Sequence, residues 1–226
     1  MQIAVTSDSA HVPDDELAFM VAACNQQSEE FCLAHGLAFV PVVFYAKGTD
    51  LGADVTHALV IVDDIEIPGV RGYHDEVDGV VYARVEFRDL AGLCPDISHE
   101  CLELILNPKL DKWHTWRGKL GQAGEACDRV QSQTYQEPVT VLGEARHYRV
   151  SNYLLPGAFI PGSHGPWDRM GSLQFWDEIA TGGYVIVVDE FGRRSNVFGA
   201  RGNVPASFAK KLANPQSRTL KIMRGA

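Results

Sequence analysis

The sequence of 226 residues contains no long apolar run and no leader-like segment at its start. Its longest apolar stretches, such as Phe39–Tyr45 and Tyr184–Val188, are far shorter than the roughly 20 residues that a membrane-spanning helix needs. No basic segment followed by an apolar one comes after Met1, so we expect no cleaved secretion signal. These absences predict a cytoplasmic protein with no membrane partner.

Cysteines are few and scattered along the chain. There are five of them, an odd number, and none belongs to a CxxC pattern; they are Cys24, Cys32, Cys94, Cys101 and Cys127. Such spacing indicates neither a disulfide framework nor a cysteine-rich metal site. We therefore expect reduced thiols.

Positive charge is also in short supply. The chain has 20 Lys and Arg against 29 Asp and Glu, which gives a formal net charge of −9. Proteins that grip the phosphates of nucleic acids need clustered Lys and Arg. Basic residues gather only late, from Arg193 to Arg224, and few aromatic residues lie among them. We interpret that segment as a solvated surface and predict no nucleic-acid partner.

What the chain does contain is enough apolar material for a core, since 46% of its residues are hydrophobic and 22% charged. Periodicity and turn residues predict an α+β fold, in which a mixed β-sheet is combined with an N-terminal helix and a second helix. The predicted elements are a strand at Gln2–Thr6, a helix from Asp14 or Asp15 to Ala34 ended by Gly36, β-rich runs at Leu37–Ala46 and Ala58–Val62, a strand at Val80–Phe87, a loop at Asp89–Pro95 and a helix at Ser98–Asn107.

The part that follows is irregular and β-rich, with candidate strands at Val139–Leu142, His147–Val150 and Tyr184–Val188. We predict a core domain over residues 1–135 and a C-terminal subdomain over residues 136–226 that packs on the core.

The second helix carries the run from His99 to Glu103. Residues four apart lie about 40° apart around a helix axis, so His99 and Glu103 project side by side and Glu100 is offset by about 100°. This resembles the HExxH metal-binding helix, in which the first and last residues bind zinc and the adjacent Glu is the general base, except that Glu103 stands where the second His would be. An ordinary solvent-facing polar side of an amphipathic helix is the competing interpretation.

A third ligand is sought downstream, in the acidic run Glu125-Ala126-Cys127-Asp128. Either Glu125 or Asp128 can complete a metal site, with the other as a hydrogen-bonding partner of His99. A plain surface cluster of acids is the alternative for both residues.

Several motifs occur in one order along the chain. They are Gly72-Tyr73-His74-Asp75, Gly79–Val85, Ser98–Leu104 with Asn107-Pro108, Glu125–Asp128, Val150-Ser151-Asn152-Tyr153 and Gly182-Gly183-Tyr184. Together they resemble a family of bacterial and phage-associated zincin-like proteins of metallopeptidase type. The resemblance covers roughly residues 55–190.

The resemblance implies a zincin-like fold whose active helix carries His99 and whose edge strand is Val80–Phe87, where an extended peptide can add as a further strand. His74 is expected in the loop before that strand, where it stabilises an oxyanion, adds a ligand or is simply hydrogen-bonded. Tyr153 is expected either to polarise the substrate as a phenol or to pack in the core.

The function predicted first is a metal-dependent peptidase that acts on a peptide or protein. His99 and Glu103 bind the ion with Glu125 or Asp128, and Glu100 activates water. One imidazole and two carboxylates neutralise a zinc ion, which weakens its Lewis acidity, so zinc or another, harder divalent ion fits the set.

The alternative is an inactive structural protein of a phage particle, in the tail, connector or capsid, with other phage structural proteins as partners. Its location would then be the infected host or the particle. Homo-oligomers fit either function.

Overall fold

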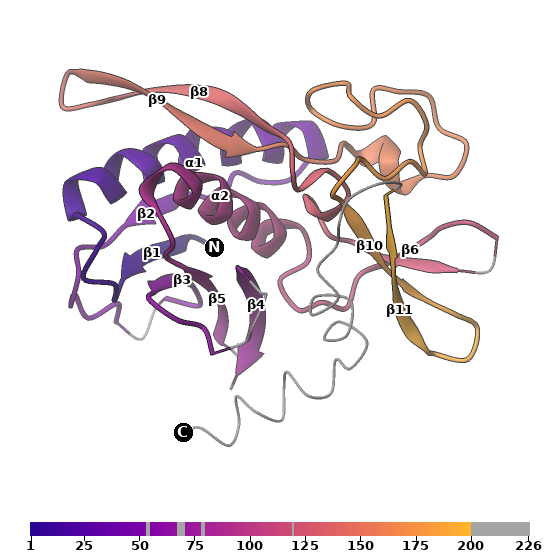
Figure 1. Ribbon diagram of the computed structural model, residues 1–226, viewed down its shortest axis with the longest axis horizontal. Coiled ribbons are helices and arrows are strands. Elements are labelled where there is room, and N and C mark those ends of the chain that lie inside the picture. Colours follow the sequence, from indigo (N-terminus) through magenta and orange to yellow (C-terminus); the bar gives the residue numbers. More distant parts are fainter. Residues whose placement is uncertain (53–54, 67–70, 78–79, 119, 200–226) are drawn as a thin grey trace.

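The computed structural model describes residues 1–52, 55–66, 71–77, 80–118 and 120–199. Within these residues the chain is a mixed structure of helices and several sheets, which confirms the predicted α+β class (Figure 1). The elements are β1 (Ile3–Ser7), α1 (Asp14–His35), β2 (Val42–Phe44), β3 (His57–Val62), β4 (Gly72–Val77), β5 (Val80–Glu86), α2 (Leu90–Leu106), β6 (Trp113–Thr115), β7 (Gly121–Ala123), the 3₁₀ turn η1 (Asp128–Val130), β8 (Thr134–Val141), β9 (Glu144–Ser151), the 3₁₀ turn η2 (Pro156–Phe159), β10 (Tyr184–Val188) and β11 (Arg194–Phe198).

A five-stranded sheet in the order β2-β1-β3-β5-β4 forms the base of the molecule. Strands β1, β2, β3 and β5 run parallel, and β4 pairs antiparallel with β5. Strand β1, which lies between β2 and β3, is buried at every residue, as expected for a strand with neighbours on both sides. Figure 1 shows α1 and α2 between this sheet and the β8–β9 hairpin, and both helices contact both layers.

Helix α1 matches its predicted extent, and Gly36 ends it in the left-handed conformation with φ 63°. The expected side-chain cap from Asp14 or Asp15 is wrong, because both residues lie inside the first turn and Pro13 occupies the cap position. Their charges still favour the helix, since the N-terminal end carries a partial positive charge.

Helix α2 begins at Leu90, so the predicted loop at Asp89–Pro95 is wrong. Asp89 caps the helix by accepting a hydrogen bond from the backbone N–H of Gly92 at 2.7 Å. Pro95 has no N–H to offer the carbonyl of Ala91, and the Arg149 side chain donates to that carbonyl at 2.9 Å instead. A tertiary contact therefore compensates for the proline that had indicated a loop.

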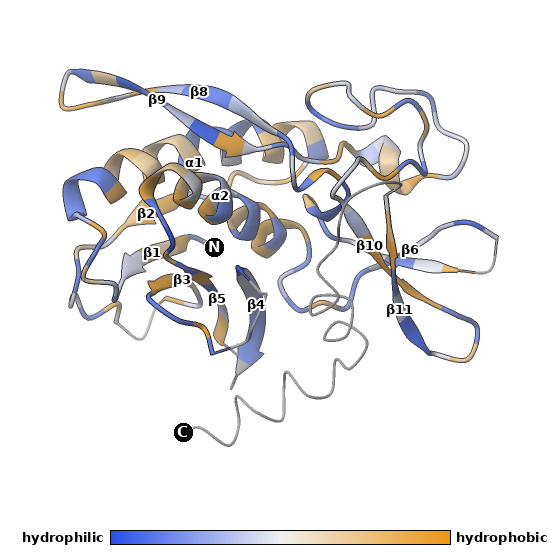
Figure 2. Cartoon of the chain, in the orientation of Figure 1, coloured by the Kyte–Doolittle hydropathy of each residue, from blue (hydrophilic) through white to orange (hydrophobic). Residues whose placement is uncertain are grey.

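Strand β4 corrects two expectations. His74 lies within this strand rather than in a loop. The edge strand on this side of the sheet is β4 rather than Val80–Phe87, because β5 lies between β3 and β4. The flanking residues 67–70 and 78–79 lie outside the described part of the chain. Figure 2 shows hydrophilic colours along β4, which explains why its sequence did not indicate a strand.

The C-terminal strands join two smaller sheets. The β8–β9 hairpin packs on the helices, and the four-stranded sheet in the order β11-β10-β7-β6 combines strands from both sides of residue 135. One hydrophobic cluster of buried residues extends from Ile3 to Ala180. The division into domains at residues 135 and 136 stays a prediction. Among the described residues, no helix is both long enough and apolar enough to cross a membrane.

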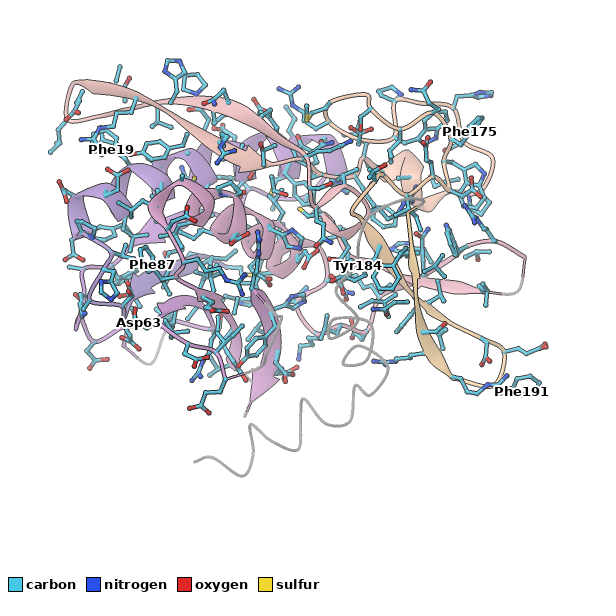
Figure 3. The ribbon with its side chains drawn as sticks, viewed as in Figure 1. Phe19, Asp63, Phe87, Phe175, Tyr184 and Phe191 are labelled. Carbon is cyan, nitrogen blue, oxygen red and sulfur yellow. The ribbon has the colours of Figure 1, made fainter. Side chains whose placement is uncertain are left out.

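The substitution Asp89→Ala should lower the free energy of unfolding by about 1 kcal/mol, because it leaves an N-terminal N–H of α2 without its acceptor. Urea unfolding followed by circular dichroism measures the change. The matched control is Asp63→Ala, an exposed carboxylate at the periphery of the fold (Figure 3), which should leave the midpoint unchanged. Equal midpoints for both variants would contradict the capping role.

Candidate metal centre

The polar side of α2 faces the interior of the protein. The side chains of His99, Glu100 and Glu103 are only 15%, 7% and 6% exposed. Interpreting this side as an ordinary solvent-facing surface is therefore wrong. The predicted neighbours one turn apart do meet, with His99 Nε2 3.1 Å from Glu103 Oε1.

The turn η1 brings a second set of ligand-type atoms to His99. Asp128 Oδ1 lies 3.4 Å from His99 Nε2, and the backbone N–H of Cys127 donates to Glu103 Oε1 at 3.4 Å. The sulfur of Cys127 belongs, with His99 and Glu103, to a group whose ligand atoms all lie within 4.8 Å of one another. Cys127 was not among the ligands expected from the sequence, although its place beside Asp128 in the acidic run was a signal for it.

Buried Arg129 holds η1 in place. Its guanidinium donates to the backbone carbonyls of Ala158, Trp176 and Glu178. The carbonyl of Arg129 approaches Gly183 so closely that a Cβ atom there would lie 2.2 Å from it, which only glycine allows. Asp128 is thereby placed by long-range contacts rather than by its own short turn.

Strand β4 supplies the second imidazole. Side chains alternate along a strand, so Gly72 and His74 share the face toward α2 while Tyr73 packs against Tyr82 on the other face. His74 Nδ1 lies 3.5 Å from Glu100 Oε2 and 3.8 Å from Glu103 Oε2. Its Nε2–H donates to the carbonyl of Asn107 at 3.3 Å, just beyond the end of α2.

Gly72 leaves the space that Glu100 occupies. A Cβ atom on residue 72 would lie 2.3 Å from Glu100 Oε1, well inside van der Waals contact. A larger residue would displace the Glu100 carboxylate from its position beside His74. The Gly-Tyr-His-Asp motif therefore makes room for one member of the cluster and provides another.

Glu125 completes the group of acids. It is 6% exposed, and its Oε2 is buried without a hydrogen bond among the described residues. Burial, reinforced by the charge of Glu103, raises the pKa of Glu125 well above its ordinary value of 4.5. Burial and the charge of Glu103 also raise the pKa of Asp128 to about 6, despite its hydrogen bond with His99. The charge of Glu103 therefore acts on both candidate third ligands. Of the two, Asp128 is the one within 4 Å of the His99 imidazole.

The acids raise the pKa of both imidazoles. Burial alone lowers the pKa of His74, but the adjacent carboxylates of Glu100, Glu125 and Glu103 outweigh it and raise the pKa to about 9. The pKa of His99 is raised well above 6.5 in the same way, since the effects of Glu103 and Asp128 exceed that of burial. Imidazoles surrounded so closely by carboxylates are in a strongly negative environment that favours a bound cation.

The donor spacing fits a metal ion. Ligands 2.0–2.1 Å from a tetrahedral zinc ion lie about 3.3 Å from one another. The separations from His99 to Glu103 and Asp128, and from His74 to Glu100, are 3.1, 3.4 and 3.5 Å. These buried His, Glu and Cys groups could hold a metal ion.

Two tyrosines differ in their relation to this centre. Tyr153 is buried with its ring edge-on to Phe31 at 5.1 Å, so packing accounts for its position. Its role as a substrate-polarising phenol stays a prediction. Tyr184 on β10, labelled in Figure 3, gives Asp128 a side-chain hydrogen bond that lowers the pKa of that carboxyl. Tyr184 belongs to the Gly182-Gly183-Tyr184 motif of the sequence, which by itself indicated no chemical role.

The chain was compared with models of protein families, with curated proteins and with solved structures, and none of the three comparisons gives a match.

The substitution Glu125→Gln should make the stability of the metal-free protein less sensitive to pH. Between pH 4.5 and the raised pKa of Glu125, the folded chain keeps a proton that the unfolded chain has released, so stability falls as pH rises. Removing this carboxyl should reduce that fall by up to about 1.4 kcal/mol per pH unit.

Urea unfolding in chelator at several pH values between 5 and 6.5 tests this. The exposed Glu144 provides the control, since Glu144→Gln should keep the wild-type slope. A wild-type slope in Glu125→Gln would show that this carboxyl ionises normally in the folded chain.

Proposed function

We propose that this chain is a metal-dependent hydrolase of peptide bonds with a zincin-like fold, whose ion is bound by His99, Glu103 and Asp128. One observation carries the proposal. The imidazole of His99, on a helix buried between a mixed sheet and a hairpin, lies 3.1 and 3.4 Å from carboxylates of two separate segments. Three protein ligands that leave a position for water are typical of a catalytic zinc ion.

The sheet supports the zincin-like assignment. The helix that carries the ligands packs against β5 and β4, and β4 is an edge strand antiparallel to its neighbour. An extended peptide can pair with such an edge through its backbone and so be held beside the centre. We assign this role to β4, in place of the Val80–Phe87 strand expected from the sequence.

The ion would lower the pKa of a water molecule and polarise the carbonyl that is attacked. Glu100 follows His99 on the helix and accepts the proton of the attacking water, which it then gives to the leaving amine. His74 holds the Glu100 carboxylate in place from strand β4. Its Nδ1 lies 3.5 Å from Glu100 Oε2, so we assign it the positioning of that carboxylate rather than direct stabilisation of an oxyanion.

The donor set supports zinc as the ion. Carboxylates alone would favour harder ions, but imidazole and a cysteine sulfur are ligands that zinc prefers. The sulfur of Cys127 lies within the His99 group. Burial raises the pKa of the Cys127 thiol, so its use as a ligand would require a cation to displace the proton.

The substitution Glu100→Gln should lower the rate of peptide cleavage by about 10²–10⁴-fold, because the amide cannot accept the proton of water. The ion at His99 should remain, since the amide leaves His99, Glu103 and Asp128 in place. Cleavage of a mixture of unstructured peptides, read by mass spectrometry, gives the rate, and elemental analysis gives the metal content.

The control is Glu144→Gln, an exposed carboxylate that should leave both quantities unchanged. A wild-type chain without bound metal that assembles into symmetric oligomers would contradict the proposal and fit a virion structural protein instead. Undiminished cleavage by Glu100→Gln would remove Glu100 from the mechanism.

A further inference from the structure

We propose that this centre binds two divalent cations, with the Glu103 carboxylate shared between them and the second ion held by His74 and Glu100. The inference rests on the metal-binding part of the proposed function and adds to it a second binding site. It gives Glu100 a second task, because its Oε2 becomes a ligand.

The geometry divides the cluster into two halves. Glu103 Oε1 lies on the side of His99, at 3.1 Å from its Nε2, and Glu103 Oε2 lies on the side of His74, at 3.8 Å from its Nδ1. The ligand atoms of His74, Glu100 and Glu103 all lie within 4.8 Å of one another, as do those of His99, Glu103 and Cys127. The two groups have only Glu103 in common, and a carboxylate can bind one ion through each oxygen.

The hydrogen bond of His74 leaves the correct ring nitrogen for an ion. Its Nε2 carries a proton because it donates to the Asn107 carbonyl, which can only accept. Metal-binding histidines commonly have their other nitrogen fixed by such a backbone carbonyl. The nitrogen that remains, Nδ1, faces the Glu100 and Glu103 carboxylates.

The contacts between His74 and the acids are too long to be its final partners. Hydrogen bonds between a charged nitrogen and a carboxylate are about 2.7–2.9 Å long. The separations here are 3.5 and 3.8 Å, and Glu100 Oε2 is buried without a hydrogen bond among the described residues. These are the spacings of ligands around a common ion, and an ion there would satisfy the unpartnered oxygen.

The burial of the acids favours bound cations as well. Glu100, Glu103, Glu125 and Asp128 are all buried, and Glu125 Oε2, like Glu100 Oε2, has no hydrogen bond among the described residues. Buried charge is tolerated only when it is compensated, and cations bound on both sides of Glu103 would compensate it.

The number of ions per chain tests the inference. The purified chain is stripped with chelator, loaded with Zn²⁺ in the presence of a weak competing chelator that clears surface sites, and measured by elemental analysis. We expect two ions in the wild type and one in His74→Asn, which removes the nitrogen of the second site. The control is His147→Asn, at an exposed histidine, which should keep two.

Gly72→Ala is a second variant that leaves every ligand present. Its new Cβ forces the Glu100 carboxylate away from His74, so it should also hold one ion. The variant Asp128→Asn removes a ligand of the ion at His99, so it should likewise bind only one ion. Circular dichroism of each variant shows whether a reduced ion count reflects the site or the loss of the fold.

Low-temperature electron paramagnetic resonance of the Mn²⁺-loaded chain gives an independent result. Two Mn²⁺ ions that share a carboxylate show magnetic coupling, whereas a single bound ion shows none. A wild type with one ion and no coupling would overturn the second site and leave the proposed function standing. A wild type with no ion would overturn both. Two uncoupled ions would show that Glu103 does not bridge them.

Discussion

The arrangement of this structure around α2 depends on the burial of four carboxyl groups beside two imidazoles. Glu100, Glu103, Glu125 and Asp128 are taken almost completely out of water. Removing charges from water costs several kcal/mol per ion unless they are paired or bind a cation. The four groups must therefore be held in fixed positions by their surroundings, and several contacts around α2 and η1 do this.

The contacts that hold these groups are individually ordinary. Gly72 leaves room for the Glu100 carboxylate, and the Asn107 carbonyl fixes the ring of His74. Arg129 ties η1 to the carbonyls of the C-terminal part, so Asp128 reaches the helix from a turn that would be unstable alone. The β8–β9 hairpin packs on α1 and α2. The centre itself is almost completely buried, which strengthens its charge interactions. Strand β4, helix α2 and the turn η1 thus meet at the metal centre.

Local signals explain the features that sequence reasoning found. The turn spacing of His99 and Glu103 follows from helix geometry, so their contact could be anticipated. Gly36 and Asn107-Pro108 are helix-ending signals that act within a few residues, and both helices end where expected. The start of α2 was predicted wrongly because Pro95 indicated a loop. The carbonyl of Ala91, which Pro95 leaves without a donor, accepts a hydrogen bond from Arg149, a residue remote in sequence. The strand β4 was not anticipated because its residues are mostly polar, and His74 among them contacts the acids of the centre.

The sequence by itself determined the α+β class, the helix that carries the ligand-type residues and the acidic segment that meets it, because each depends on short-range periodicity or on residue type. Only the tertiary structure decided that β4 is the edge strand, that His74 faces Glu100 and Glu103, and that Cys127 joins the group around His99. The reason is physical. Strand order and convergence across a core arise from the packing of segments that are far apart along the chain, and no local pattern records that packing.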